Sequence, residues 1–238
     1  MELYDVMRTA FAAREFKDQP VDDATLARLL DNARFAPSGG NRQGWQVIVV
    51  KDPALRARFV PLMRPIAQRY AAQVKAGESP LNTVVPTRLT AEEIAATAPP
   101  EALLAQLVSA PVLLVVAVDL RVVAAMDAGL ARVGVVPGAS IYPFVWNILL
   151  AARNEGLGGV LTTFLASAEP QVQALLGLPS HYALAAMLPL GYPVRQLRRL
   201  KRKPVSTFAW VDRFEGAPLV ASATDPATLS PKSDIPNA

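Results

Sequence analysis

Apolar side chains recur at the three- and four-residue spacing of an amphipathic helix in several stretches of this chain. Asp22 or Asp23 can cap the second of these stretches. Ser140 can cap the fifth, which ends at Gly156, a residue type that commonly ends helices. The pattern predicts helices over residues 3–10, 22–33, 54–60, 121–130, 140–156 and 169–176.

Four shorter, largely apolar runs have the length of strands. Residues 111–118 are apolar throughout, which predicts a central strand buried on both faces; the run is too short to span a bilayer. The other predicted strands cover residues 46–50, 159–163 and 182–190. Helices and strands do not alternate regularly, and no Gly-x-Gly-x-x-Gly follows a strand. The pattern therefore favours an α+β layered fold over a doubly wound sheet.

Residues 61–101 differ from the rest because they are rich in proline and contain no predicted strand. Short helical pieces are expected at 66–75 and 91–96. Long connections in compact domains are commonly functional, so we interpret this segment as a helical lid inserted into a single domain over 1–214. A mobile surface excursion is the alternative. Residues 215–238 are predicted to form a C-terminal tail, loose or packed on a partner subunit.

The composition limits the chemistry that the side chains can perform. The chain has no cysteine, which excludes disulfides, thiolate metal sites and cysteine nucleophiles. With His181 as the single histidine, zinc sites of the usual kind and histidine-based triads are disfavoured, and we predict no metal. An enzyme of this composition therefore needs a cofactor to carry the reaction.

The net charge of +4 and the pI of about 9.6 suit anionic ligands such as phosphates. Residues 195–203 form a basic run that by itself would also suit an anion- or nucleic-acid-binding module. No aromatic residues are interleaved with this run, so we expect no nucleic-acid partner. Residues 1–5 lack the apolar core of a signal peptide, so we expect a cytoplasmic protein without membrane contact.

The most informative stretch, residues 33–45, leads from a predicted helix into a predicted strand. Pro37 ends the helix, and Gly39–Gly40 allows the backbone to approach a ligand closely. Asn41 and Gln43 carry paired donors and acceptors that can read the edge of a flat heterocycle. A plain helix-to-strand connection is the alternative.

The same stretch resembles the flavin-contacting loop of the nitroreductase family, Ala-Pro-Ser-x-x-Asn-x-Gln-Pro-Trp, except that Gly44 stands at the family's second proline. Residues 147–158 resemble the family's Asn-x-x-Leu-Ala-Ala-x-x-x-Gly-Leu-Gly. Residues 190–193 and 202–204 resemble its Gly-Tyr-Pro and basic-Pro close. The three pieces occur in the family's order, and the resemblance extends over residues 3–214.

The resemblance implies a central mixed or antiparallel sheet flanked by helices, in a domain-intertwined homodimer. It implies two sites for FMN at the subunit interface, each contacted by both chains. The flavin carries the reaction in this family, so no side chain is predicted to be catalytic. The cofactor-binding residues implied within the first motif are Pro37, Ser38, Gly39, Asn41 and Gln43.

Arg14 matches the last basic position of the family's Arg-Arg-Ser-x-Arg-x-Phe, where the side chain faces the flavin pyrimidine. A surface ion pair with Glu15 or Asp18 is the alternative. The family's Arg-Arg-Ser reads Ala10-Phe11-Ala12 here, which removes the usual phosphate contacts. Arg8 is a candidate to reach the phosphate from one helical turn away.

Arg202 resembles the family's phosphate-binding arginine, and Lys201 is a second candidate; a solvated basic surface is the alternative. Thr162 and Thr163 stand where the family places backbone N–H groups against flavin N5, and an ordinary half-buried strand is the alternative there.

The resemblance implies an FMN-dependent NAD(P)H oxidoreductase. NADH or NADPH would reduce the flavin at N5 and leave, and a nitroaromatic or quinone-like acceptor would then enter the same slot. Reductive dehalogenation, flavin destruction or dehydrogenation on the same flavin platform is the alternative. The predicted lid would select the substrate.

Overall fold

The computed structural model describes residues 1–220, and the chain divides into two compact units, Met1–Arg199 and Leu200–Ala238. The boundaries that the sequence analysis expects, a domain over 1–214 and a tail over 215–238, stay predictions. Residues 221–238 of that tail lie outside the described residues.

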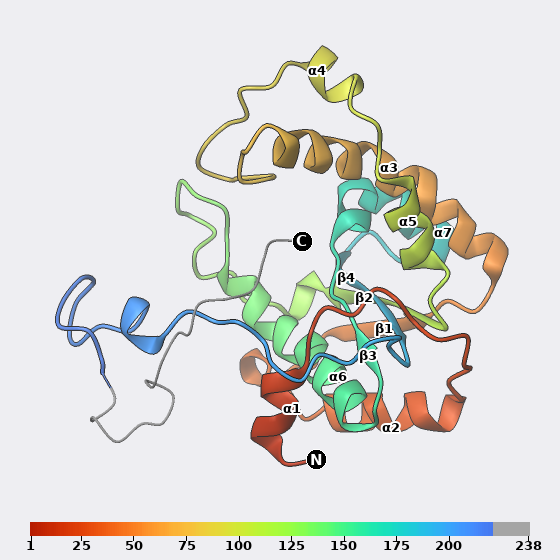
Figure 1. The fold of residues 1–238 in the computed structure, drawn as a ribbon, viewed down its shortest axis with the longest axis horizontal. Helices are drawn as coiled ribbons and strands as arrows, with labels where there is room; N and C mark the ends of the chain where they lie inside the picture. The colour runs from red at the N-terminus through yellow and green to blue at the C-terminus, as the bar shows by residue number, and fades with distance from the viewer. Residues whose placement is uncertain (221–238) are drawn as a thin grey trace. The chain divides into compact units, whose positions relative to one another are not determined.

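The first unit is built on an antiparallel sheet in the order β1-β2-β4-β3 (Figure 1). The strands are β1 (Trp45–Val49), β2 (Val112–Asp119), β3 (Gly158–Gly159) and β4 (Tyr182–Gly191). All three strand pairs are antiparallel, and a register shift at Val116/Ala117 inserts one extra residue into β4 opposite β2. The predicted α+β class and antiparallel sheet are confirmed.

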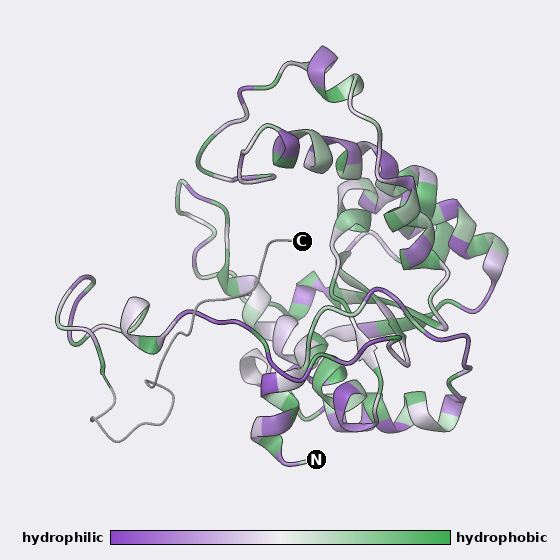
Figure 2. Cartoon of the chain, in the orientation of Figure 1, coloured by the Kyte–Doolittle hydropathy of each residue, from purple (hydrophilic) through white to green (hydrophobic). Residues whose placement is uncertain are grey.

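Helices cover both faces of this sheet, and β2 is buried along its whole length. Residues Val112, Leu114, Val116 and Val118 pack with α2 (Asp23–Ala33) and α6 (Tyr142–Asn154). The alternate residues of β2 pack with the helices of the opposite face. Figure 2 shows the strands and α6 largely in the hydrophobic colour. This double burial explains why β2 is a continuous apolar run. Helix α1 (Leu3–Thr9) packs on α6.

The opposite face is covered by α3 (Pro53–Lys75), α5 (Glu101–Val108) and α7 (Glu169–Leu176). Helix α3 is continuous where the sequence analysis expects two pieces separated at Pro61 and Pro65. Both prolines are exposed. The carbonyls whose helical hydrogen bonds they remove therefore lie on the solvent side, where water can replace the bonds. A fully buried stripe at four-residue spacing holds the helix on the sheet: Phe59, Met63 and Ala67.

The structure differs from the sequence-based predictions at three places. Helix α5 forms where no helix was predicted. Residues 121–130 are not a helix, because only the 3-10 turn Leu120–Val122 forms and the Asp127 carboxylate then accepts hydrogen bonds from the backbone of Val135 and Val136. The strand expected at 159–163 is reduced to β3, with one further bridge between Thr162 and Met187.

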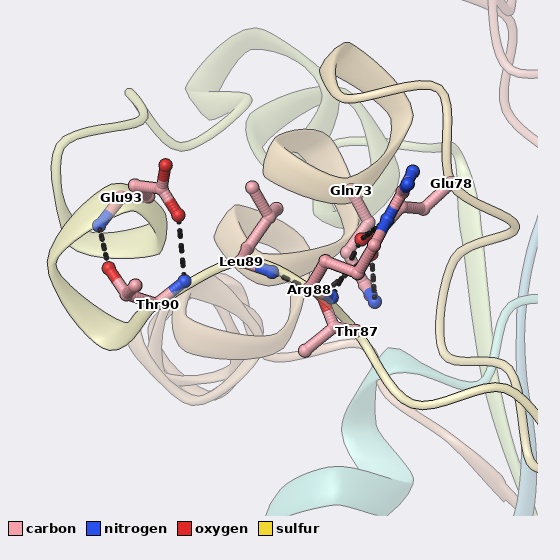
Figure 3. A network of polar contacts seen from close by, with 7 residues as sticks. All are labelled: Gln73, Glu78, Thr87, Arg88, Leu89, Thr90 and Glu93. Atoms are coloured by element: carbon pink, nitrogen blue, oxygen red, sulfur yellow. Dashed lines mark hydrogen bonds and ion pairs between the residues drawn. The ribbon is translucent and has the colours of Figure 1, made fainter.

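Polar contacts order the segment between α3 and α4 (Ala91–Ala95), as Figure 3 shows. The Glu78 carboxylate accepts hydrogen bonds from Gln73 Nε2 at 3.2 Å, Thr87 Oγ1 at 2.6 Å and the Arg88 N–H at 2.9 Å. These bonds lower the pKa of Glu78, the Thr87 hydroxyl contributing most. A capping box between Thr90 and Glu93 then starts α4. The segment is thus a fixed arm in this structure; its role as a lid stays a prediction.

In the second unit the structure describes residues 200–220. A 3-10 turn over Val205–Thr207 is followed by a bridge between Trp210 and Pro218. Within residues 1–220, no helix combines the length and apolar character needed to cross a membrane.

Candidate functional site

The loop that follows α2 has an unusual backbone. Gly39–Asn41 forms a 3-10 turn in which Gly40 has φ 62°, and two non-glycine residues also adopt positive φ: Asn41 at 53° and Gln43 at 50°. Such conformations are uncommon for side-chain-bearing residues, and they persist only where surrounding contacts impose them.

Three hydrogen bonds impose this conformation. The Gln43 N–H donates to Ser38 Oγ at 3.0 Å, and Gln43 Nε2 donates to Asn41 Oδ1 at 3.2 Å. The Gly39 N–H donates to Ser140 Oγ at 3.2 Å. Asn41 and Gln43 are both exposed, so the loop presents two adjacent carboxamides to solvent. Ser140 was expected to cap α6, which has no side-chain cap; it anchors the loop instead.

The surroundings of residue 44 explain why this chain has glycine where the family motif has its second proline. A Cβ at residue 44 would lie 2.6 Å from Cγ2 of Val122, and the Gly44 carbonyl accepts a hydrogen bond from the Asp119 N–H at 2.8 Å. A residue larger than glycine does not fit against Val122 without movement. Trp45 then enters β1 stacked on Phe144 of α6, with 4.6 Å between ring centroids. The loop is therefore fixed at both ends.

Asp119, the last residue of β2, forms an ion pair with Arg121. Its carboxylate accepts bonds from the guanidinium of Arg121, the shortest at 2.7 Å from Nη2, and from the Arg121 N–H at 3.0 Å. The side-chain contact with Arg121 is the main reason that the pKa of Asp119 falls to about 2. The carboxylate is charged at neutral pH, and it fixes the backbone just before Val122.

An open, largely apolar pocket of about 850 Å³ lies next to this corner, between the end of β2, the start of α6 and β4. Tyr142 and Trp146 of α6 line it and are 42% and 44% exposed. The Tyr142 hydroxyl donates to the Ala185 carbonyl at 3.3 Å, at the extra residue of β4. Val123 also lines the pocket. The pocket offers aromatic and aliphatic surface to a planar ligand.

The other predicted residues of the first unit do not join this loop by any hydrogen bond within residues 1–220. Thr162 exchanges backbone hydrogen bonds with Met187, at 3.0 and 2.8 Å, so its N–H is already used. Thr163 is exposed and its N–H donates to no described residue. Arg8 lies on α1, with its guanidinium over the Tyr4 ring at 5.8 Å. Arg14 is exposed and makes only a long bond, 3.4 Å, to the Ala12 carbonyl.

Lys201 and Arg202 belong to the second unit, where Arg202 Nη1 donates to the Lys201 carbonyl at 2.7 Å. Their binding of phosphate stays a prediction, as do the cofactor-binding roles of the other candidates. Sequence reasoning missed Ser140 and Val122 as determinants of the loop. No local signal marks them, because both act through contacts far along the chain. Within the described part of the chain, no group of three or more His, Cys, Asp or Glu side chains could hold a metal ion.

Comparison with known proteins gives the class. The profile of the nitroreductase family matches residues 8–192. The chain is 31% identical over 189 residues to an NADH dehydrogenase of Thermus thermophilus, covering 77% of this chain and 82% of that protein. It is 26% identical over 215 residues to human iodotyrosine deiodinase 1, covering 86% of this chain but only 66% of the relative's length. This chain thus spans just under two thirds of the deiodinase.

A solved structure of oxidised iodotyrosine deiodinase bound to FMN and 3-iodo-L-tyrosine superposes with a TM-score of 0.60 at 26% identity, covering 89% of this chain and all of that one (100%). The α+β fold with its open antiparallel sheet is therefore nitroreductase-like. The chain belongs to the nitroreductase family.

Proposed function

We propose that this protein is a flavin-dependent oxidoreductase that binds FMN and uses NADH or NADPH to reduce a small, electron-poor aromatic acceptor such as a quinone or a nitroaromatic. The observation that carries the proposal is the backbone of the Pro37–Gln43 loop, held at positive φ so that Asn41 and Gln43 present adjacent carboxamides to solvent. Unfavourable backbone conformations of this kind cluster at ligand-binding sites.

The donor set fits a flavin. The edge of the isoalloxazine ring alternates acceptors with a donor, and carboxamides such as those of Asn41 and Gln43 carry both. The Thr163 N–H is available for a further bond. The relative of known structure at 26% identity contains FMN. When bound, FMN supplies the two-electron redox centre that this chain's side chains lack.

The electrons and protons of the proposed reaction balance without a side chain that acts as acid or base. NAD(P)H supplies two electrons and one proton and becomes NAD(P)⁺. A quinone acceptor takes the two electrons, that proton and one more from solvent to become the hydroquinone. The residues of this chain orient the partners, and Tyr142 and Trp146 offer aromatic surface on which a planar acceptor can stack.

The active form is proposed to be a homodimer. The family resemblance implies an FMN site contacted by both chains, and we propose that the Pro37–Gln43 loop of one subunit and Thr163 of the other contact the same flavin. The arm held by Glu78 is proposed to act as the lid that selects the acceptor, because its polar network fixes it as a built segment.

The first test is the visible spectrum of the purified protein, before and after anaerobic addition of NADH or NADPH. The proposal predicts flavin bands that the nicotinamide bleaches and that a quinone restores. Asn41→Ala should weaken flavin binding, while Asn32→Ala, at an exposed position on α2, is the matched control. A colourless protein that takes up neither FMN nor riboflavin would contradict the proposal.

Reductive dehalogenation is a second candidate, favoured by the 26% identity to human iodotyrosine deiodinase 1 and to the solved iodotyrosine deiodinase structure. This reaction would replace an aryl C–I bond by C–H, consuming two electrons and one proton and releasing iodide. Incubation of the reduced protein with 3-iodo-L-tyrosine decides between the candidates. Stoichiometric iodide would favour dehalogenation, whereas quinone turnover without iodide would favour the first proposal.

A further inference from the structure

A second, smaller pocket of about 320 Å³ lies between the segment that follows α1 and the segment that leaves β4. Two arginines line it, Arg14 and Arg195, together with Ala12, Glu15 and Gln106. From the sequence, Arg14 is expected to face the flavin pyrimidine, and Arg195 has no role beyond its place in a basic run; the pocket gives both arginines a different, shared role.

Backbone pairing brings the segments that carry the two arginines to the same pocket. Phe16 and Pro193 form an antiparallel bridge. The Val194 N–H donates to the Glu15 carbonyl at 3.0 Å, and the Lys17 N–H donates to the Tyr192 carbonyl at 2.8 Å. These pairs share one register, in which residues 14 and 195 come next. The second segment bends at Val194 and Arg195, and both arginines are exposed and line the pocket.

Both segments are anchored beyond this pairing. The Ala13 N–H donates to the Gly159 carbonyl at 3.1 Å, which ties the first segment to β3. Nε2 of Gln196 donates to the Thr9 carbonyl at 3.0 Å, which ties the second segment to the end of α1. The two guanidiniums therefore leave neighbouring, well-supported backbone positions.

Two like charges that line one pocket repel each other unless an opposite charge joins them. Neither Arg14 nor Arg195 forms a salt bridge with any residue from 1 to 220. Glu15 is the one carboxylate that lines the pocket, and it too is unpaired within that range. The lining thus carries an excess positive charge with two guanidinium groups, which together suit an anion with several oxygens.

We propose that Arg14 and Arg195 form a binding site for a phosphomonoester. This inference rests on the proposed function, because a flavin–nicotinamide enzyme meets this group in two molecules: the 5′-phosphate of FMN and the 2′-phosphate of NADPH. The small side chain of Ala12 leaves the space open. The pair would supply the charge that Ala10-Phe11-Ala12 lacks.

The test compares affinities with and without the phosphate. FMN is measured against riboflavin, and 2′-AMP against adenosine, by calorimetry or flavin fluorescence. The wild type should prefer the phosphorylated member of one pair by about tenfold or more, as charge-assisted hydrogen bonds imply. That preference should fall towards unity in Arg14→Gln and in Arg195→Gln, and be partly kept in Arg195→Lys. The pair of ligands affected identifies the source of the phosphate.

Arg58→Gln is the matched control, since Arg58 is exposed on α3 and lines neither pocket described above. Arg8→Gln and Arg202→Gln test the arginines that the sequence favoured for phosphate. A preference that survives in both pocket variants, or that disappears only with Arg8 or Arg202, would overturn the inference. So would a wild type without any phosphate preference, even if it bound riboflavin well. A wild type that binds neither FMN nor riboflavin, but binds 2′-AMP more tightly than adenosine and loses that preference in Arg195→Gln, would refute the proposed function and uphold the phosphate site.

Discussion

Ser140 Oγ accepts a hydrogen bond from the Gly39 N–H at 3.2 Å, although 101 residues separate the two in the sequence. Ser140 is buried and is the last residue of the 3-10 turn that leads into α6, and Gly39 lies in the loop that follows α2. This contact ties the candidate flavin loop to the helix that forms the core of the first unit, so the loop is positioned by the fold and not by its own sequence alone.

Ser140→Ala should therefore loosen the loop. Loss of one buried acceptor should cost about 1 kcal/mol of unfolding free energy and should weaken flavin binding. Urea denaturation and a flavin titration measure the two effects. Ser109→Ala is the control, because that hydroxyl is exposed and bonds only to Gln106 three residues away. Equal behaviour of the two variants would show that the Ser140 contact does not matter.

Gly44→Ala should be destabilising by about 1–3 kcal/mol, because the added Cβ would lie 2.6 Å from Val122 Cγ2. Val122→Ala removes that obstacle. In a double-mutant cycle monitored by thermal unfolding, the two changes should show a favourable coupling, with the double variant more stable than the sum of the single effects. Simple additivity would mean that Val122 is not the reason for glycine at this position.

Arg56 joins α3 to the strand ends. Its Nε donates to the Val50 carbonyl and its Nη1 to the Ala110 carbonyl, both at 2.6 Å, and burial lowers the pKa of the guanidinium. Arg56→Met keeps the aliphatic stem but leaves these carbonyls unpaired, so we expect a loss of about 2–3 kcal/mol. Arg58→Met on the exposed face of α3 should be nearly neutral in the same chemical denaturation experiment.

Acid should destabilise the loop that precedes α6. Asp127 is 4% exposed, and hydrogen bonds from the Val135 N–H and from Arg132 lower its pKa to about 2. A lowered folded-state pKa stabilises the fold above the ordinary value near 4, and the contribution is lost as the pH falls to about 2. Melting temperatures between pH 5 and pH 2 should fall less steeply in Asp127→Asn than in the wild type. Parallel slopes would contradict this assignment.

The arm between α3 and α4 should open when its central carboxylate is removed. Glu78→Ala should expose the peptide bond after Arg88 to trypsin and should change acceptor preference while leaving flavin affinity intact. Glu92→Gln, in the first turn of α4, is the control. Limited proteolysis followed by mass spectrometry locates the cut. An arm that opens without any change in acceptor kinetics would remove its role as a lid.

Much of the fold followed from local patterns. The continuous apolar run of β2, the stripe at Leu26 and Leu29 in α2, and Gly156 after α6 each correspond to an element that forms. The errors share a cause. Pro61 and Pro65 would break an isolated helix, yet α3 continues because its buried stripe packs on the sheet. The helix expected at 121–130 is replaced by backbone contacts to Asp127 that no short window of sequence reveals.

The sequence by itself determined the chemistry that is available: no thiol, one histidine, and a loop with two carboxamides beside two glycines. It also indicated the family through three short motifs. Only the tertiary structure decided that Ser140 holds this loop, that Val122 requires Gly44, and that Arg195 and Arg14 line the same pocket. The physical reason is that composition and local motifs are properties of neighbouring residues. The contacts that place these groups join residues far apart in the chain, which are brought together when both faces of the sheet are buried.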